Sequence, residues 1–184
     1  MAQRSPNLTL RPTVDADLDF VMAAEGHPDN RPFVGQWSRQ EHADACTDPD
    51  HRHYILHGDQ NAGSNPKSLQ ANVDPVVTAR VGYLMMQGMT DPHLTLQIRR
   101  IVVTEKGKGY GRMALRLAKQ IAFEKFSTHR LWLDVKTHNP RARHLYESEG
   151  FVYEGTLREC CKVGDRFESL AVLSILREEY EKNR

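Results

Sequence analysis

Residues 98–112 of this chain read Ile98-Arg-Arg-Ile-Val-Val-Thr-Glu-Lys-Gly-Lys-Gly-Tyr-Gly-Arg112. The stretch begins as an apolar β-strand, passes through a turn with three glycines, and ends where a helix is expected from Met113 to Phe126. Glycines lack a Cβ atom, so the backbone N–H groups of such a turn can approach a ligand closely. Because a helix N-terminus favours an anion, the stretch predicts a phosphate-binding loop with Lys108 and Arg112 beside it.

The strand before this turn changes its apolar face near Arg99 and Arg100. Apolar residues occupy even positions from 94 to 98 and odd positions from 101 to 103. The side-chain period of a strand is two, so the change indicates a β-bulge or a bend at the two arginines. A bulge also leaves backbone N–H and C=O groups unpaired, and an extended ligand can bind to them.

Three phosphate-binding motifs compete for the glycines. A P-loop ends in Gly-Lys-Ser/Thr, and residues 111–113 do not supply that ending. Residues 109–114 fit the dinucleotide pattern G-x-G-x-x-A, and a strand ending in Asp134 follows. Against dinucleotide binding, only one βαβ unit is visible in the sequence.

The third motif has a partner further along the chain. Residues 106–111, Lys-Gly-Lys-Gly-Tyr-Gly, resemble the Q/R-x-x-G-x-G/A pyrophosphate loop of the GNAT superfamily of N-acetyltransferases, with lysine at the Q/R position. Residues 139–151, Asn-Pro-Arg-Ala-Arg-His-Leu-Tyr-Glu-Ser-Glu-Gly-Phe, resemble the second signature of the family, N-x-x-A-x-x-L-Y-x-x-x-G-F. The resemblance covers roughly residues 94–176. It implies that acetyl-CoA is the co-substrate and that a primary amine attacks it directly in a ternary complex.

Composition limits the other possibilities. Lysine and arginine number 25 against 24 acidic residues, so the near-neutral charge argues against nucleic acid or an anionic membrane as the principal partner. We find no apolar run of membrane-spanning length and no signal-peptide pattern. Cys46 and the adjacent pair Cys160–Cys161 do not make a disulfide framework. We therefore expect a reduced, cytoplasmic protein folded as a single domain over residues 1–184.

The periodicity and capping signals give an order of elements. We expect strands and helices in this order: strand 7–11, a helix from Thr13 or Asp15 to Gly26, a helix from 38 to 46, strands 53–57, 76–86 and 94–103, helix 113–126, strand 130–135, a helix between Asn139 and Gly150, and strands 151–162 and 167–175. A long hairpin loop is expected from 58 to 75. The order β-α-α-β-β-β-α-β-α-β-β predicts an α/β (α+β) fold with a mixed, mostly antiparallel seven-stranded sheet and helices on both faces, which is also the GNAT fold.

In the fold that the resemblance implies, the strand before the glycine turn and strand 131–135 run parallel and then separate. The thioester of acetyl-CoA lies in that gap. The pantetheine arm would pair with the bulged strand, and the phosphates would lie at the glycine turn and the next helix. The predicted cofactor contacts are Ile101, Val102, Val103, Lys108, Gly109, Tyr110, Gly111, Arg112, Asn139 and Arg143.

Tyr146 and Asp134 are the candidate catalytic residues. By resemblance, Tyr146 is the general acid that protonates the departing thiolate. Asp134 occupies the place of a glutamate proposed as the base in ribosomal-protein alanine acetyltransferases, with a side chain one methylene shorter. Glu25 or a chain of water molecules could serve as the base instead. Structural roles remain open for both residues: packing beside Leu145 for Tyr146, and hydrogen bonding to neighbouring backbone for Asp134.

The sequence leaves the acceptor open among polypeptide amino groups, polyamines, aminoglycosides and other small amines. Glu25 and Trp37 would suit a cationic amine through charge and aromatic contact. A non-catalytic acyl-CoA-binding domain is the alternative function, although such a domain needs neither Tyr146 nor Asp134. The C-terminal hairpin could form a homodimer.

Three histidines, His51, His53 and His57, share one parity in the expected strand. A metal site would need further ligands, and no cysteine lies near them in the sequence. We therefore expect surface histidines and no metal.

Overall fold

A computed structural model describes residues 7–59 and 78–183. Its elements are β1 (Leu8–Pro12), the 3-10 turn η1 (Asp15–Asp17), α1 (Leu18–Gly26), α2 (Arg39–Thr47), β2 (His51–Asp59), β3 (Thr78–Gln87), β4 (Thr95–Val103), α3 (Tyr110–Gln120), the π-helical turn η3 (Ile121–Lys125), β5 (Arg130–Lys136), α4 (Pro140–Ser148), β6 (Val152–Val163), β7 (Arg166–Leu176) and α5 (Arg177–Lys182). The predicted order of strands and helices is confirmed. The short C-terminal α5 was not predicted, and the expected loop over 58–75 lies mostly outside the described residues.

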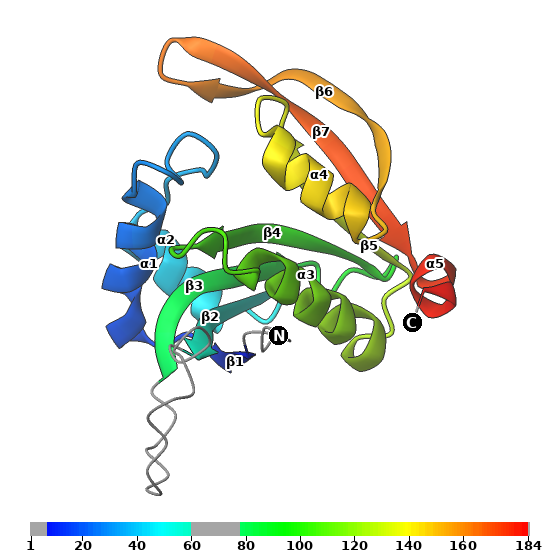
Figure 1. Ribbon diagram of the computed structural model, residues 1–184, viewed down its shortest axis with the longest axis horizontal. Helices are drawn as coiled ribbons and strands as arrows, with labels where there is room; N and C mark the ends of the chain where they lie inside the picture. The colour runs from blue at the N-terminus through cyan, green and yellow to red at the C-terminus, as the bar shows by residue number, and fades with distance from the viewer. Residues whose placement is uncertain (1–6, 60–77, 184) are drawn as a thin grey trace, which may run out of the picture.

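The strands form one seven-stranded sheet in the order β1-β2-β3-β4-β5-β7-β6 (Figure 1). Neighbouring strands are antiparallel except β4 and β5, which are parallel. The predicted mixed, mostly antiparallel sheet is therefore confirmed. Within the described ranges, no helix is long and apolar enough to cross a membrane.

The helices cover both faces of the sheet. On β3, Leu84 belongs to an apolar cluster shared with α3, while its neighbour Tyr83 belongs to a cluster shared with α1 and α2. Successive side chains of a strand point to opposite faces. Helix α3 therefore covers one face and α1 with α2 the other, and α4 contributes to the α3 side through Leu145 and Tyr146.

Two of the helices begin as the sequence predicts. Ser38 and Glu41 form a reciprocal capping box at the start of α2. The Asn139 side chain accepts a hydrogen bond from the Ala142 backbone at 3.1 Å, with Pro140 in the first turn of α4.

The parallel strands β4 and β5 separate soon after they pair. Their pairing ends at Gln97 and Trp132, although β4 continues to Val103 and β5 to Lys136. The backbone of β4 beyond Gln97 is therefore not paired with β5, and a gap opens between the two strands.

The predicted bulge lies in β4 beside this gap. Met85 pairs with Arg100 and Met86 pairs with Ile98, so Arg99 is the extra residue. Leu94 had been predicted on the apolar face of this strand. It is instead half exposed and precedes the strand in a left-handed conformation with φ of 54°.

The prediction that the three histidines lie on the surface is wrong for His53. Strand β2 begins early enough to include it, and its side chain is only 5% exposed because α2 covers that face. Within the described ranges, no group of three or more potential ligand side chains could hold a metal ion.

Candidate active site

The glycine-rich turn leads directly into α3. Gly107 and Gly109 both have φ of +81°, a conformation that other residues rarely adopt, and Gly109 is the N-cap residue of α3. A Cβ atom added at Gly109 would meet no atom within 4 Å, so the space in front of the helix is open. The positive end of the α3 dipole lies at this N-terminus, where an anion is favoured. The turn therefore fits the pyrophosphate of acetyl-CoA.

The cationic side chains of the turn are held by neighbours. Lys108 pairs with Glu105 at 2.5 Å, and Lys106 donates a hydrogen bond to the side chain of Asn30. Tyr110 is buried, with its ring against Gly58. A contact between Tyr110 and a cofactor would therefore involve its backbone.

Arg112 belongs to a cluster around Glu149 that was not predicted from the sequence. The Glu149 carboxylate pairs with Arg112 at 2.5 Å, Arg116 at 2.9 Å and Lys119 at 3.3 Å. Burial alone would raise the pKa of Glu149, but hydrogen bonds from Arg116, Arg112 and Lys119 lower it to about 2. The cluster fastens the end of α4 to α3. The only signal in the sequence is the helical spacing of the three cations.

The predicted contacts on α4 serve the helix itself. Asn139 is its cap, which leaves the amide nitrogen of the side chain for a ligand. Arg143 pairs with Glu147 at 2.8 Å and lies over the ring of Tyr153 at 4.5 Å.

Tyr146 of α4 lies close enough to Asp134 of β5 for its pKa to respond to the aspartate charge. Burial, and secondarily the charge of Asp134, raises the pKa of Tyr146 to about 12. Burial raises the pKa of Asp134, while the charge of Arg99 and a hydrogen bond of 2.9 Å from Gln97 oppose that shift. The tyrosine is therefore protonated at neutral pH, as a proton donor must be, and Asp134 is a weaker acid than an exposed aspartate.

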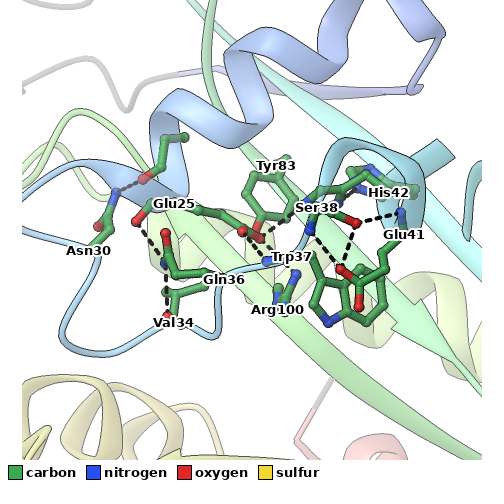
Figure 2. A network of polar contacts seen from close by, with 12 residues as sticks. Glu25, Asn30, Val34, Gln36, Trp37, Ser38, Glu41, His42, Tyr83 and Arg100 are labelled. Atoms are coloured by element: carbon green, nitrogen blue, oxygen red, sulfur yellow. Dashed lines mark hydrogen bonds and ion pairs between the residues drawn. The ribbon is translucent and has the colours of Figure 1, made fainter. Parts of the chain in front are cut away.

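Glu25 lies at the centre of a buried network (Figure 2). Its carboxylate accepts hydrogen bonds from Arg100 at 2.7 Å, from the Trp37 backbone at 3.1 Å and from the Tyr83 hydroxyl, and it contacts His42 at 3.2 Å. Burial would raise the pKa of Glu25, but His42 and Arg100 are the main causes of a net lowering. Glu25 is therefore charged, and its oxygens are already engaged within the protein.

Trp37 is likewise engaged by arginine. The Arg100 guanidinium lies 4.3 Å from the centre of the Trp37 ring, and the Arg99 guanidinium lies 6.0 Å away. The structure thus brings Glu25 and Trp37 together around Arg100, which was not predicted as a site residue.

A chain of buried polar groups extends behind Glu25. The Thr13 hydroxyl contacts His53 Nδ1 at 2.8 Å, and His53 Nε2 contacts His42 Nδ1 at 3.2 Å. Burial lowers the pKa of His53 to about 3, so its ring is neutral. His42 and His53 come from different elements, and no pattern in the sequence could have paired them.

A hollow of about 390 Å³ adjoins the point where β4 and β5 separate. Its lining includes Gln97, whose side chain also donates a hydrogen bond to the candidate base Asp134 at 2.9 Å. It is lined by Asp50, Gln87, Gly88, Thr90, Asp91, Pro92, Thr95, Gln97 and Trp132.

Comparisons with known proteins agree with this geometry. The family model described as "Acetyltransferase (GNAT) family" matches residues 29–151. A spermidine N(1)-acetyltransferase of Vibrio cholerae serotype O1 is 27% identical over 176 residues, covering 94% of this chain and 95% of the relative.

Solved structures show the same fold. A spermidine N-acetyltransferase from Vibrio cholerae, in complex with CoA and spermine, superimposes with a TM-score of 0.77 at 22% identity, covering 95% of this chain and 98% of the other. A dodecameric structure of spermidine N-acetyltransferase from the same organism gives a TM-score of 0.72 at 23% identity, covering 96% and 97% of the two chains.

The match of the family model extends over most of the chain and includes both motifs, Asp134 and Tyr146. Neither the dinucleotide-binding alternative nor the non-catalytic one gains support from any of these matches. The chain belongs to the GNAT family, and it is an acetyl-CoA-dependent N-acetyltransferase that acetylates a primary amine.

Proposed function

We propose that the acceptor is a small aliphatic amine with more than one positive charge, of the polyamine class. The observation that carries the proposal is the hollow beside Asp134, with an aromatic ring and two carboxylates in its lining. The curated relative is named for spermidine, and one solved neighbour holds spermine. Both names support the proposal.

The spacing along β5 suits such an acceptor. Asp134 and Trp132 are two residues apart on one face of the strand, or about 7 Å. If the reacting nitrogen of the acceptor lies at Asp134, the aliphatic chain of the acceptor would pass over Trp132. A second ammonium group on that chain would then reach the hollow. The Trp132 ring favours a cation on its face, and the Arg130 guanidinium already lies 5.6 Å from the ring centre.

The far end of the hollow carries negative charge. Burial would raise the pKa of Asp50, but hydrogen bonds from Thr90 and the Gly88 backbone lower it overall, so the group is ionised at neutral pH. Asp91 lies in the same lining. Two carboxylates in the lining of the hollow favour an acceptor with a second, distal positive charge.

The roles of the catalytic residues follow from their surroundings. Asp134 would take a proton from the acceptor's ammonium group, directly or through water, so that the neutral amine can attack the thioester carbonyl. Tyr146 would donate a proton to the thiolate that departs as the C–S bond breaks. Backbone groups of β4 from Ile101 to Val103 would bind the pantetheine arm and polarise the thioester carbonyl. The phosphates would lie at Lys108 to Arg112, with Asn139 and Arg143 nearby on α4.

We also propose a homodimer through the outer hairpin, β6 and β7. The hairpin projects along one side of the molecule with β6 at the open edge of the sheet (Figure 1). Apolar side chains are exposed on it: Val152, Tyr153, Leu157, Val163 and Phe167. Light scattering of the wild type and of Phe167→Glu tests this, and a monomeric wild type would contradict it.

An acceptor panel tests the proposed substrate class. Thiol release from acetyl-CoA should be fastest with polyamines and α,ω-diamines, and slower with monoamines of the same chain length. Asp91→Asn should slow the reaction with polyamines and diamines and leave the rates with monoamines unchanged. Equal rates with diamines and matched monoamines, or a preference for peptide amino groups, would contradict a polyamine acceptor.

A further inference from the structure

The segment between α1 and α2, residues 27–37, lies across the open end of the gap; we name it the crossing loop. At the β4 side, the Asn30 side chain donates to the Ala24 carbonyl at 2.8 Å, contacts the Val103 carbonyl at 3.5 Å and accepts from Lys106. At the β5 side, the Pro32 carbonyl accepts hydrogen bonds from Lys136 at 3.0 Å and His138 at 3.4 Å. The crossing loop therefore joins the far ends of the two strands that separate.

The second half of the crossing loop lies beside the ion pair of Glu25 and Arg100 (Figure 2). The two side chains are 2% and 7% exposed, and Glu25 also accepts from the Trp37 backbone at 3.1 Å. Arg100 stacks on the Trp37 ring, and its Nη2 atom would lie 3.2 Å from a Cβ atom at Gly35. Because the pair is excluded from water, its geometry is held more firmly than that of a surface pair.

The bulge in β4 is what turns Arg100 toward this loop. Leu96 and Ile98 point to the α3 face, and Arg100 would follow them in a regular strand. The extra residue Arg99 moves Arg100 to the opposite face, where Glu25 lies. The register shift at Arg99 therefore allows Arg100 to form the ion pair with Glu25.

We infer that Arg100 is a positioning residue for the acceptor: held by Glu25, it fixes the crossing loop as the wall of the acceptor site opposite Asp134. The loop is bound through the Pro32 carbonyl to Lys136, two residues beyond Asp134 on β5, so movement of the loop would be transmitted to the strand that carries Asp134. The inference rests on the proposed placement of the acceptor. It does not involve the glycine turn, so CoA binding is independent of it.

Arg100→Met tests the inference by removing the charge and the planar group together. The expected result is a KM for the acceptor about tenfold or more above wild type, with the CoA dissociation constant within about twofold. Arg100→Lys keeps the positive charge but lacks the planar group that stacks on Trp37. Its KM for the acceptor should therefore lie between those of the wild type and Arg100→Met. An unchanged KM in folded Arg100→Met would overturn the inference.

Loss of one partner from a buried ion pair can unfold a protein, so a milder variant is needed. Gln36 is exposed, and its side chain donates to the carbonyls of Glu25 at 3.2 Å and Val34 at 3.1 Å. Gln36→Ala should raise the acceptor KM several-fold without a change in melting temperature. Gln40→Ala is the matched control. Among the described residues, the Gln40 side chain donates its hydrogen bond to Asp44, within α2, at 2.8 Å and makes no hydrogen bond to the crossing loop. Equal KM values in the two variants would also overturn the inference.

A measurement without acceptor separates this inference from the proposed function. Amide hydrogen exchange of residues 30–37 should speed up in Arg100→Met and Gln36→Ala and stay as in wild type in Gln40→Ala. If the wild type acetylates no amine in the panel, the proposed acceptor class fails. The positioning role can still be tested in that case, because an unchanged rate of amide hydrogen exchange in Gln36→Ala would overturn it. Faster exchange with unchanged acceptor KM would overturn it as well.

Discussion

Tyr146 is the single residue on which the proposed protonation step depends. Its phenol is protonated at neutral pH, since burial raises its pKa to about 12, and the phenol lies close enough to Asp134 to respond to its charge. Tyr146→Phe removes one hydroxyl group and keeps the ring. We expect kcat to fall about 10²-fold and CoA affinity to stay unchanged, because the hydroxyl acts mainly in the transition state. Tyr54→Phe, on β2, is the control. Lost CoA affinity with kcat preserved would instead make Tyr146 a cofactor contact.

Asp134 and Arg99 set the expected pH dependence. Burial raises the pKa of Asp134 and the Arg99 charge lowers it, so removal of Arg99 must raise this pKa further. A base works only when deprotonated, and its loss of activity on acidification follows its pKa. Arg99→Met should therefore move the acid limb of kcat/KM to higher pH, whereas Arg166→Met, at the start of β7, should not. An acid limb that stays in place in Arg99→Met would argue that Asp134 is not the base.

Single residues also show what sequence can reveal and what it cannot. The extra residue at Arg99, the cap at Asn139 and the open turn at Gly109 were predictable because each follows from local backbone geometry. The engagement of Glu25 by Arg100 was not, because the two residues lie far apart in the sequence. A carboxylate that looked free for an amine is saturated by partners from four other segments of the chain.

At the scale of elements, the start of α3 is expected to bind the pyrophosphate. Gly109→Val places a branched side chain in the open space before the helix and imposes a strained φ. CoA affinity should be lost. The strain should cost about 1–3 kcal/mol of stability.

Gly164→Val provides the matched control. Gly164 also has a positive φ, 58°, and open space around it, but it lies in the turn between β6 and β7. It should lose similar stability and keep its CoA affinity. Equal CoA affinity in the two variants would exclude the turn as the phosphate site.

The attachment of α4 to α3 depends on Glu149. Its pKa is lowered from 4.5 to about 2 in the folded state, so its contribution to stability is complete above about pH 4.5 and is lost as the pH falls toward 2. Glu149→Gln should melt at a lower temperature than the wild type at pH 7. The difference between the two melting temperatures should be smaller at pH 3. A difference that grows on acidification would contradict this assignment.

At the scale of the molecule, the sequence was sufficient for the order of elements, the helices on both faces and the separation of β4 from β5. Periodicity shows which face of an element is apolar and glycines show where the chain turns, and the family motifs supply the topology. Partners across elements remain hidden, as with His42 and His53, or Glu149 with the three cations of α3. The acceptor side depends on such contacts, and for that reason it was the least predictable part of the site.

The central claim is that the acetyl group passes directly from the thioester to the amine while both lie in the gap between β4 and β5. Initial rates over a grid of acetyl-CoA and acceptor concentrations test it most directly. A ternary complex predicts double-reciprocal lines that intersect. Parallel lines, with an acetylated enzyme detected by mass spectrometry in the absence of acceptor, would contradict it and would point to a covalent intermediate, for which the free cysteines are candidate nucleophiles.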